Sequence, residues 1–179
     1  MIIRTKKEER AINDFYVTDS FIIESLLKKE YFDKRILEPA CGSGSISEVL
    51  KKHNYFVFSS DKYDHNYGTI YDFFDILYFP GDVVTNPPYT KALEFVLHAL
   101  KITQEGAKIA MLLRLQFLEG QKRFEKLFKN NPPYKIYVFV KRQNCYKNGI
   151  EEKQSSMITY AWFIWKKGYK GYPFIDWIN

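Results

Sequence analysis

The sequence predicts an α/β domain built on a mostly parallel, seven-stranded sheet, with an antiparallel hairpin at one edge and helices on both faces. Short apolar runs alternate along the chain with segments in which apolar residues recur every three or four positions. Glycine-rich or polar segments follow several of these runs. A polar loop, rather than a helix, separates the last two runs, so we expect these two strands to pair antiparallel.

Each expected element has a local signal. Asp19 or Ser20 can cap a first helix, whose apolar face begins with Ile22 and Ile23. Ser45 begins a Ser-x-x-Glu pattern, typical of a helix capping box, directly after a glycine-rich turn. Further helices are expected at residues 93–100 and 124–128, and the seven strands at residues 35–38, 55–59, 69–71, 82–85, 108–113, 134–140 and 157–165.

The composition indicates one globular domain, expected to span residues 1–179. The chain is 46% hydrophobic and 27% charged. Its apolar runs are short and broken by charge, and its N-terminal residues lack the apolar stretch of a signal peptide, so we expect a cytoplasmic protein with no membrane partner. Cys41 and Cys145 stand outside any Cys-x-x-Cys pattern and the three histidines stand alone, so we expect neither a disulfide nor a metal site.

Charge is distributed unevenly about a net value of +6. Residues 1–90 contain 11 basic and 14 acidic side chains, whereas residues 91–179 contain 16 and 7. An acidic half suits a cationic cofactor, and a basic half suits a phosphate backbone. The alternative is that lysines such as Lys122, Lys126 and Lys129 only solubilise helix surfaces.

The tetrapeptide Asn86-Pro87-Pro88-Tyr89 follows the strand expected at residues 82–85. The Asn86 side-chain oxygen and the Pro87 carbonyl can each accept one N–H of a planar amine, which favours a tetrahedral nitrogen with an available lone pair. The prolines stiffen the loop, because each fixes its own φ and restricts the residue before it. Tyr89 offers a flat ring on which a base can stack. The alternative is an ordinary turn at the end of a strand.

A glycine-rich turn, Glu38-Pro39-Ala40-Cys41-Gly42-Ser43-Gly44, ends the strand expected at residues 35–38. Its glycines let backbone N–H groups approach a ligand closely beside a helix N-terminus. Asp61 lies 17 residues after Gly44, close to the spacing at which an acidic residue accepts ribose hydroxyls in dinucleotide-binding folds. Ser47 stands where the third glycine of a nicotinamide-binding motif would be, so a dehydrogenase is not favoured.

Together these segments resemble the class I S-adenosylmethionine-dependent methyltransferases, and within them the N6-adenine type, with the closest likeness to small phage-type DNA adenine methyltransferases. The likeness covers most of the chain and implies a Rossmann-like fold without a separate target-recognition domain. It implies S-adenosyl-L-methionine as cofactor and Asn86, Pro87, Pro88 and Tyr89 as catalytic residues. The cofactor contacts that it implies are Tyr16, Thr18, Glu38, Pro39, Ala40, Cys41, Gly42, Gly44, Asp61, Asp72, Phe73 and Asn86.

The expected substrate is adenine N6 in DNA. The loop after residue 140 interleaves charge with an aromatic ring, and we expect Lys141, Arg142, Tyr146 and Lys147 to bind nucleic acid. An RNA base and a protein glutamine stay open as substrates, because a planar side-chain amide meets the same loop chemistry. A module that binds the cofactor or a nucleic acid without turnover also stays open, as does the oligomeric state.

Overall fold

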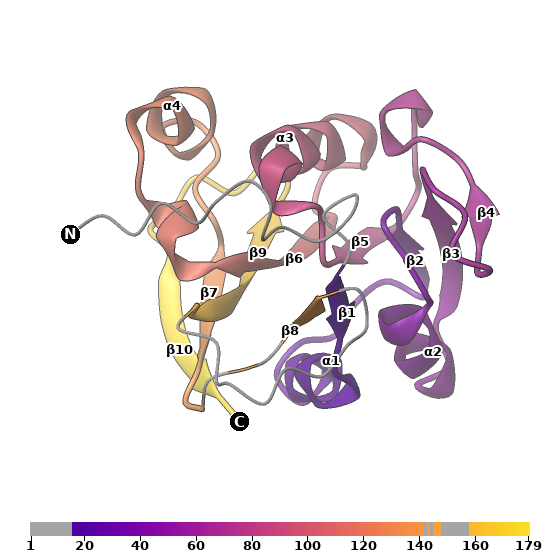
Figure 1. The fold of residues 1–179 in the computed structure, drawn as a ribbon. Helices are drawn as coiled ribbons and strands as arrows, with labels where there is room; N and C mark the ends of the chain where they lie inside the picture. The colour runs from indigo at the N-terminus through magenta and orange to yellow at the C-terminus, as the bar shows by residue number, and fades with distance from the viewer. Residues whose placement is uncertain (1–15, 142, 144, 148–157) are drawn as a thin grey trace.

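The computed structural model of the protein describes residues 16–141, 143, 145–147 and 158–179 (Figure 1). Its main sheet has eight strands in the order β10-β7-β9-β6-β5-β2-β3-β4, and β1 and β8 form a separate antiparallel pair. Neighbours in the main sheet are parallel, except that β9 is antiparallel to both β6 and β7. The strands are β1 (Tyr16–Thr18), β2 (Arg35–Glu38), β3 (Phe56–Asp61), β4 (Thr69–Ile70), β5 (Asp82–Thr85), β6 (Lys108–Arg114), β7 (Lys135–Phe139), β8 (Cys145–Lys147), β9 (Tyr160–Lys166) and β10 (Phe174–Ile178).

The predicted fold class is confirmed: the sheet is mostly parallel and contains the expected antiparallel hairpin, formed by β7 and β9. The sheet has one more strand than predicted, because β10, which follows the last predicted strand in the sequence, lies beside β7. The Phe174 N–H donates to the Tyr134 carbonyl and the Val140 N–H to the Ile178 carbonyl, each at 3.1 Å. The hairpin therefore lies one strand in from the edge of the sheet.

The helices are α1 (Ser20–Leu27), α2 (Ser45–Lys52), α3 (Ala92–Ile102) and α4 (Gln121–Arg123), which continues as a π-helix at Phe124–Phe128. They cover both faces of the sheet, and the side chains of the central strands alternate between two cores. In β6, Ile109, Met111 and Leu113 face the core on the side of α3, whereas Ala110 and Leu112 face the core on the side of α1 and α2. Figure 1 shows α3 and α4 on one side of the sheet and α1 and α2 on the other.

One helix cap is confirmed and one is wrong. Asp19 caps α1, and its side chain accepts a hydrogen bond from the Phe21 N–H at 2.9 Å. The predicted capping box at Ser45 does not form, because the N-cap of α2 is Gly44, whose φ of 86° lies in the left-handed region. Glu48, the acidic residue of the expected box, instead accepts hydrogen bonds from the Lys51 ammonium and the Tyr67 hydroxyl.

A buried carboxylate holds the amino ends of the strands together, at the edge of the sheet opposite the predicted ligand segments. Glu30 accepts hydrogen bonds from the Lys108 ammonium at 2.6 Å, the Lys135 ammonium at 2.5 Å and the Tyr137 hydroxyl at 2.6 Å. Burial raises the pKa of Glu30, but the three hydrogen bonds outweigh burial and hold the pKa below its ordinary value. This cluster stabilises the scaffold rather than the candidate site.

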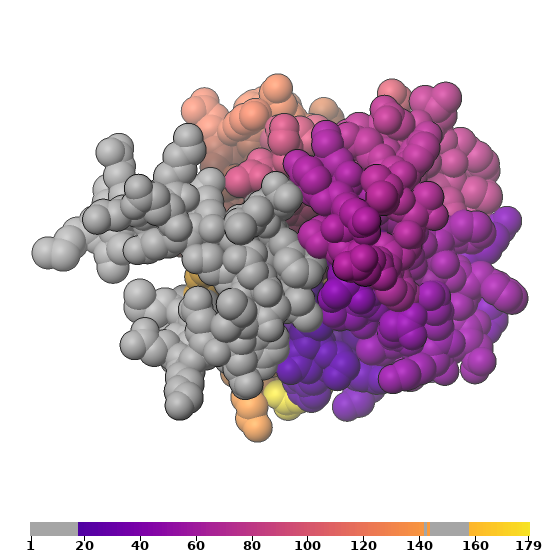
Figure 2. Space-filling model, turned by 45° about the vertical axis from the view of Figure 1, so that its right-hand side comes forward, coloured from indigo at the N-terminus to yellow at the C-terminus, as the bar shows by residue number. Residues whose placement is uncertain are grey.

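The two halves of the chain occupy different halves of the sheet. Strands β2 to β5 come from residues 35–85 and stand together, whereas β6, β7, β9 and β10 come from residues 108–178. In Figure 2 the described residues of the first half, indigo to magenta, gather on one side of the molecule. The acidic and basic halves of the sequence therefore meet between β5 and β6, directly beside Asn86.

Candidate active site

Three predicted ligand segments meet at one edge of the sheet. Strands β5, β2 and β3 are parallel neighbours, so their carboxyl ends lie together. These ends carry Asn86–Tyr89, Glu38–Gly44 and Asp61, respectively. The chain passes from β2 to β3 and β4, then crosses back to β5 on the other side of β2. Such a reversal is where open α/β sheets bind ligands.

Asp61 and the glycine turn hold each other in place. The Gly42 N–H donates to Asp61 Oδ2 at 2.9 Å, and the Tyr63 N–H donates to Asp61 Oδ1 at 3.0 Å. Gly42 and Gly44 have φ values of 51° and 86°, which glycine adopts without the strain that a side chain would impose. A carboxylate has about four lone-pair positions, so Asp61 keeps acceptor capacity for ribose hydroxyls.

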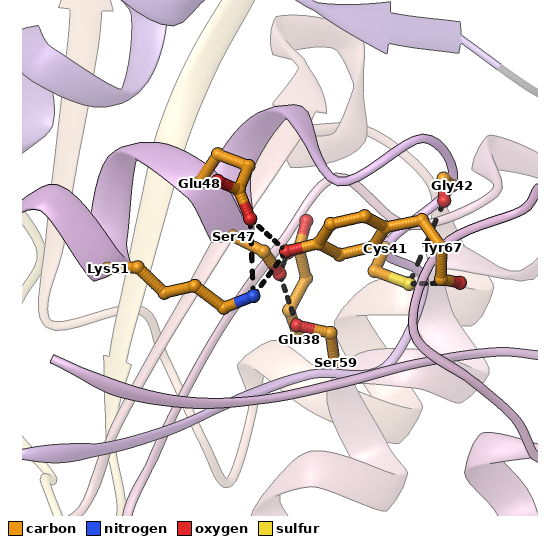
Figure 3. Close-up of polar contacts among 8 residues, drawn as sticks. All are labelled: Glu38, Cys41, Gly42, Ser47, Glu48, Lys51, Ser59 and Tyr67. Carbon is orange, nitrogen blue, oxygen red and sulfur yellow. Dashed lines mark hydrogen bonds and ion pairs between the residues drawn. The ribbon is translucent and has the colours of Figure 1, made fainter.

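Glu38 lies buried inside the turn and is only 1% exposed. The Ser47 hydroxyl donates to Glu38 Oε2 and lies 2.5 Å from the Ser59 hydroxyl (Figure 3). Burial raises the pKa of Glu38, the hydrogen bonds from Ser47 lower it, and burial prevails, so that the pKa is about 8. At neutral pH the side chain is therefore mostly a neutral acid. Its predicted contact with a cofactor stays a prediction, since the carboxyl group is directed to Ser47.

Cys41 is a buried thiol of the same turn. Its Sγ lies 3.8 Å from the carbonyl oxygens of Gly42 and Tyr67 (Figure 3). Burial, together with the nearby acidic groups of Glu38 and Asp61, raises the pKa of Cys41 to about 12. The thiol therefore stays protonated and packs as a small turn residue rather than acting as a nucleophile.

Tyr67 is a residue of this region that sequence reasoning missed. Its ring packs against Gly44, where an added Cβ would lie 2.5 Å from the ring atoms. Its hydroxyl donates to Glu48 Oε1 at 2.6 Å and accepts a hydrogen bond from the Lys51 ammonium at 2.6 Å (Figure 3). Tyr67 thus ties the β3–β4 connection to α2. The local signal was weak: one aromatic residue before Gly68 in a polar loop.

Asn86 is held by Thr18, a residue predicted only as a cofactor contact. Asn86 Nδ2 donates to Thr18 Oγ1 at 3.0 Å, and Thr18 is 5% exposed. Asn86 Oδ1 is buried and has no hydrogen-bond partner among the described residues. A buried polar atom is normally paired, so this oxygen is an acceptor available to a ligand.

Tyr89 begins a single turn of 3₁₀-helix, Tyr89–Lys91, that leads into α3. The ring is half-buried rather than openly displayed. The Arg114 guanidinium carbon lies over the ring, 4.9 Å from its centroid, and the Tyr160 ring lies 5.7 Å away at 34°. Pro88 has φ −58° and ψ 121°, so its φ lies near the value that the proline ring imposes. Sequence reasoning did not single out Arg114, because nothing local links it to Tyr89.

Asp72 and Phe73 differ in what they can offer a ligand. Asp72 Oδ1 accepts from the Phe74 N–H at 3.0 Å, and Asp72 Oδ2 accepts from the Lys62 ammonium at 2.9 Å. The hydrogen bond from Lys62 lowers the pKa of Asp72 below its ordinary value. Phe73 is 1% exposed and packs against Phe95. Its side chain belongs to the core, so Phe73 can reach a ligand only through its backbone.

The segment predicted to bind nucleic acid is partly described. Lys141 is exposed, and Arg142 lies outside the described residues. Tyr146 and Lys147 lie in β8, whose backbone pairs with β1. Because β1 also contains Thr18, the backbone of this segment lies beside the residue that holds Asn86. The structure thereby brings together two segments that the sequence presented separately.

A surface hollow of about 540 Å³ lies along β3, away from the Asn86–Tyr89 loop. Its lining includes Lys51, Ser59, Tyr67 and Thr69. Lys51 and Tyr67, which are hydrogen-bonded to each other, are part of this lining, whereas no residue of the Asn86–Tyr89 loop is. The candidate active site is therefore defined by the side chains at the carboxyl ends of β5, β2 and β3 rather than by this hollow.

Two broader findings concern the described residues. None of their helices is long and apolar enough to cross a membrane. Nor do they contain a group of three or more His, Cys, Asp or Glu side chains arranged to hold a metal ion.

The chain matches neither a protein-family model nor a curated protein sequence. Solved structures do match it. A provisionally assigned class I S-adenosylmethionine-dependent methyltransferase from Listeria monocytogenes matches at 14% identity and a TM-score of 0.57, over 88% of this chain and 62% of that protein. A provisionally assigned RNA methyltransferase from Pyrococcus horikoshii matches at 14% identity and a TM-score of 0.57, over 83% and 81%. A SAM-dependent O-methyltransferase from Thermotoga maritima matches at 19% identity and a TM-score of 0.53, over 85% and 65%.

The chain thus has the class I methyltransferase fold. It spans less than two thirds of the Listeria and Thermotoga proteins. The names of these neighbours differ in the acceptor they imply, so the fold alone does not identify the substrate.

Proposed function

We propose that the protein transfers a methyl group from S-adenosyl-L-methionine to an exocyclic amine, and that this amine is adenine N6 in DNA. The observation that carries the proposal is the state of Asn86 Oδ1. This oxygen is buried, lacks a partner among the described residues, and stands at the carboxyl end of β5 beside the glycine turn. It is the acceptor that a bound amine requires.

The residues around the glycine turn fit the proposed cofactor. Asp61 ends β3, and Asp72 follows β4 by two residues, so two carboxylates lie at the same edge as the turn. Such carboxylates can accept hydrogen bonds from ribose hydroxyls and from an exocyclic amine. When bound, S-adenosylmethionine would supply an electrophilic methyl group.

Alignment of the amine is the task of the Asn86–Tyr89 loop. The lone pair of an adenine amine is delocalised into the ring, which makes the nitrogen a poor nucleophile. Asn86 Oδ1 and the Pro87 carbonyl can each accept one of its N–H groups and favour a tetrahedral nitrogen. Thr18 fixes the Asn86 amide for this purpose. The alkylated nitrogen is cationic and acidic, so its proton can pass to water without a dedicated base.

Charge favours a nucleic acid as the substrate. Residues 91–179 carry 16 basic and 7 acidic side chains, and the strands they supply begin at β6, next to the loop. In duplex DNA the target base would have to be flipped out of the stack, at a cost of a few kcal/mol. An RNA base and a protein glutamine amide meet the same loop chemistry and are the alternative substrates. Binding without turnover is the non-enzymatic alternative.

Side-by-side transfer of labelled methyl from the cofactor to DNA, RNA and a protein mixture tests the proposal. We expect the label in DNA, recovered as N6-methyladenine, and expect Asn86→Ala to abolish most of it. Asn130→Ala, which changes an exposed asparagine after the π-helix, is the matched control and should behave like the parent. Label in RNA alone or on glutamine would replace the DNA substrate. Cofactor binding with no transfer to any acceptor would refute an enzymatic role.

A further inference from the structure

We infer that Arg114 is a substrate-binding residue, whose guanidinium leaves the Tyr89 ring for a substrate phosphate when a base stacks on that ring. The inference rests on the proposed function and deepens it. It adds a residue that the sequence did not single out, and it requires a phosphate beside the methylated base.

Arg114 stands at the same sheet edge as the Asn86–Tyr89 loop. It is the last residue of β6, and β6 lies beside β5 with Met111 opposite Thr85, the residue before Asn86. On its other side β6 pairs with β9, where Tyr160 lies opposite Arg114. The Arg114 guanidinium carbon lies 4.9 Å from the centroid of the Tyr89 ring. The residue is therefore already in contact with the loop proposed to hold the base.

The charge of Arg114 lacks the polar partners that the other described arginines have. Arg35 lies 3.5 Å from Asp33 Oδ1, and Arg123 Nε donates to the Glu119 carbonyl at 2.7 Å. Arg114 has no carboxylate within ion-pair distance in the part of the chain that the structure describes, and its Nε is buried there without a hydrogen-bond partner. A guanidinium has five N–H donors, so its capacity to bind an anion is unused.

Arg114 is also the neighbour of Tyr89 that can move. Tyr160 is 3% exposed and fixed within β9, and the Tyr89 ring packs against the core that contains Tyr160. Arg114 is half-buried, and within the part of the chain that the structure describes its guanidinium is held on the ring by the guanidinium–ring contact alone. The face of Tyr89 under Arg114 is therefore the face that a base can reach once the guanidinium leaves.

The chemistry of the guanidinium suits this exchange. It is planar and weakly hydrated, so it stacks on aromatic rings, and its paired N–H groups also match a phosphate. A nucleotide in a chain replaces both interactions: its base takes the ring and its phosphate takes the guanidinium. A free nucleoside or a glutamine side chain offers no phosphate and would leave the displaced charge unpaired. Arg114 thus favours a polynucleotide substrate over either of them.

Binding measurements with neutral backbone linkages test the inference. The probe is a labelled single-stranded oligothymidylate with one central adenosine, and in a second version methylphosphonates replace the two phosphates beside the adenosine. In a third version two distant phosphates are replaced. We expect the parent to bind the second version on the order of tenfold more weakly than the first, and to bind the third with a smaller loss.

Variants at Arg114 assign this loss to the residue. Arg114→Ala should bind the all-phosphate strand more weakly, with a salt slope reduced by about 0.7, and should not distinguish the second version from the third. Arg35→Ala removes an arginine at the opposite edge of the sheet and should behave like the parent. If Arg114 only supported the Tyr89 ring, Arg114→Ala would bind the strand more weakly but would still distinguish the second version from the third.

Several outcomes overturn the inference: a parent that does not bind the strand, a parent indifferent to the flanking linkages, or an Arg114→Ala variant as sensitive to them as the parent. If Arg114→Ala does not fold, Arg114→Gln, which keeps most of the side-chain length, replaces it, and the parent comparison still decides. Because no methyl transfer is measured, the two proposals fail separately. If methyl is transferred to DNA but binding does not depend on the flanking phosphates, only the role inferred for Arg114 is rejected. If binding depends on those phosphates but no methyl is transferred, the proposed enzymatic function is rejected.

Discussion

Thr18 and Asn86 are joined by a hydrogen bond of 3.0 Å across 68 positions of sequence. Thr18 lies in β1, and Asn86 opens the loop after β5. The bond uses the amide nitrogen of Asn86 and leaves its oxygen as the acceptor for a substrate. The first prediction concerns this pair.

Thr18→Val should lower turnover at saturating cofactor. The substitution keeps the shape of the side chain and removes the oxygen that holds the Asn86 amide. A hydrogen bond of this kind contributes about 0.5–1.5 kcal/mol, so turnover should fall by roughly two- to tenfold. Thr18→Ser keeps the oxygen and is the matched control. Steady-state rates at saturating cofactor and substrate check this, and equal rates for Val and Ser variants would contradict it.

Asn86→Ala should abolish most methyl transfer and leave cofactor binding largely intact. Loss of one preorganised polar contact typically costs on the order of 10²–10³ in rate, and the Pro87 carbonyl alone cannot align the amine. The measurement combines single-turnover rates with calorimetry of cofactor binding. A parental rate in the variant would mean that Asn86–Tyr89 is only a structural turn.

Asp61→Ala should weaken cofactor binding by roughly 1.5–3 kcal/mol, because the carboxylate would lose charge-assisted bonds to ribose hydroxyls. The structure adds that Asp61 also accepts the Gly42 and Tyr63 N–H groups, so the melting temperature should fall as well. Asp64→Ala is the matched control, since Asp64 lies in the same loop and, within the described part of the chain, its carboxylate accepts the Asn66 N–H. Calorimetry showing equal affinity in Asp61→Ala and the parent would remove Asp61 from the site.

The burial of Glu38 predicts a pH dependence of stability. The pKa of Glu38 is about 8 in the folded protein, above the ordinary value of 4.5. A raised pKa means that folding favours the protonated form. The contribution of protonated Glu38 to the free energy of unfolding is fully present below about pH 4.5 and is lost as the pH rises to about 8. Relative to Glu38→Gln, which stays neutral, the parent should therefore lose stability across that window, by an amount on the order of a few kcal/mol.

Urea unfolding of the parent and Glu38→Gln at several pH values checks this prediction. Glu30→Gln is the control of opposite sign, because the pKa of Glu30 is lowered and its stabilisation is lost as the pH falls. A difference between the parent and Glu38→Gln that is constant from pH 4.5 to 8 would show that Glu38 is not held neutral.

Lys141 and Lys147 provide the last prediction. If they contact substrate phosphates, neutralising either should reduce the slope of log affinity against log salt by about one unit on duplex DNA. Lys126→Ala changes an exposed lysine of the π-helix and should leave the slope unchanged. A DNA titration in increasing salt is the measurement. An unchanged slope after both replacements would return this segment to a solvent-exposed role.

Local patterns predicted much of the fold and part of the site. The strand ending at Thr85, the proline-containing loop that follows it and the turn through Gly42 and Gly44 were predicted where they lie. Proline and glycine restrict or extend the backbone at their own positions, so a short sequence is enough to specify such loops. The capping box at Ser45 failed for a related reason, since the left-handed conformation of Gly44 already starts the helix.

The sequence by itself determined which chemical groups follow the strands, because strand patterns and turn residues act over a few positions. Only the tertiary structure decided what those groups touch. It paired Thr18 with Asn86, placed Arg114 over Tyr89 and buried Glu38 so that its pKa rose. These contacts depend on strand order and on water being excluded from the packed sheet, and neither property belongs to any short stretch of chain.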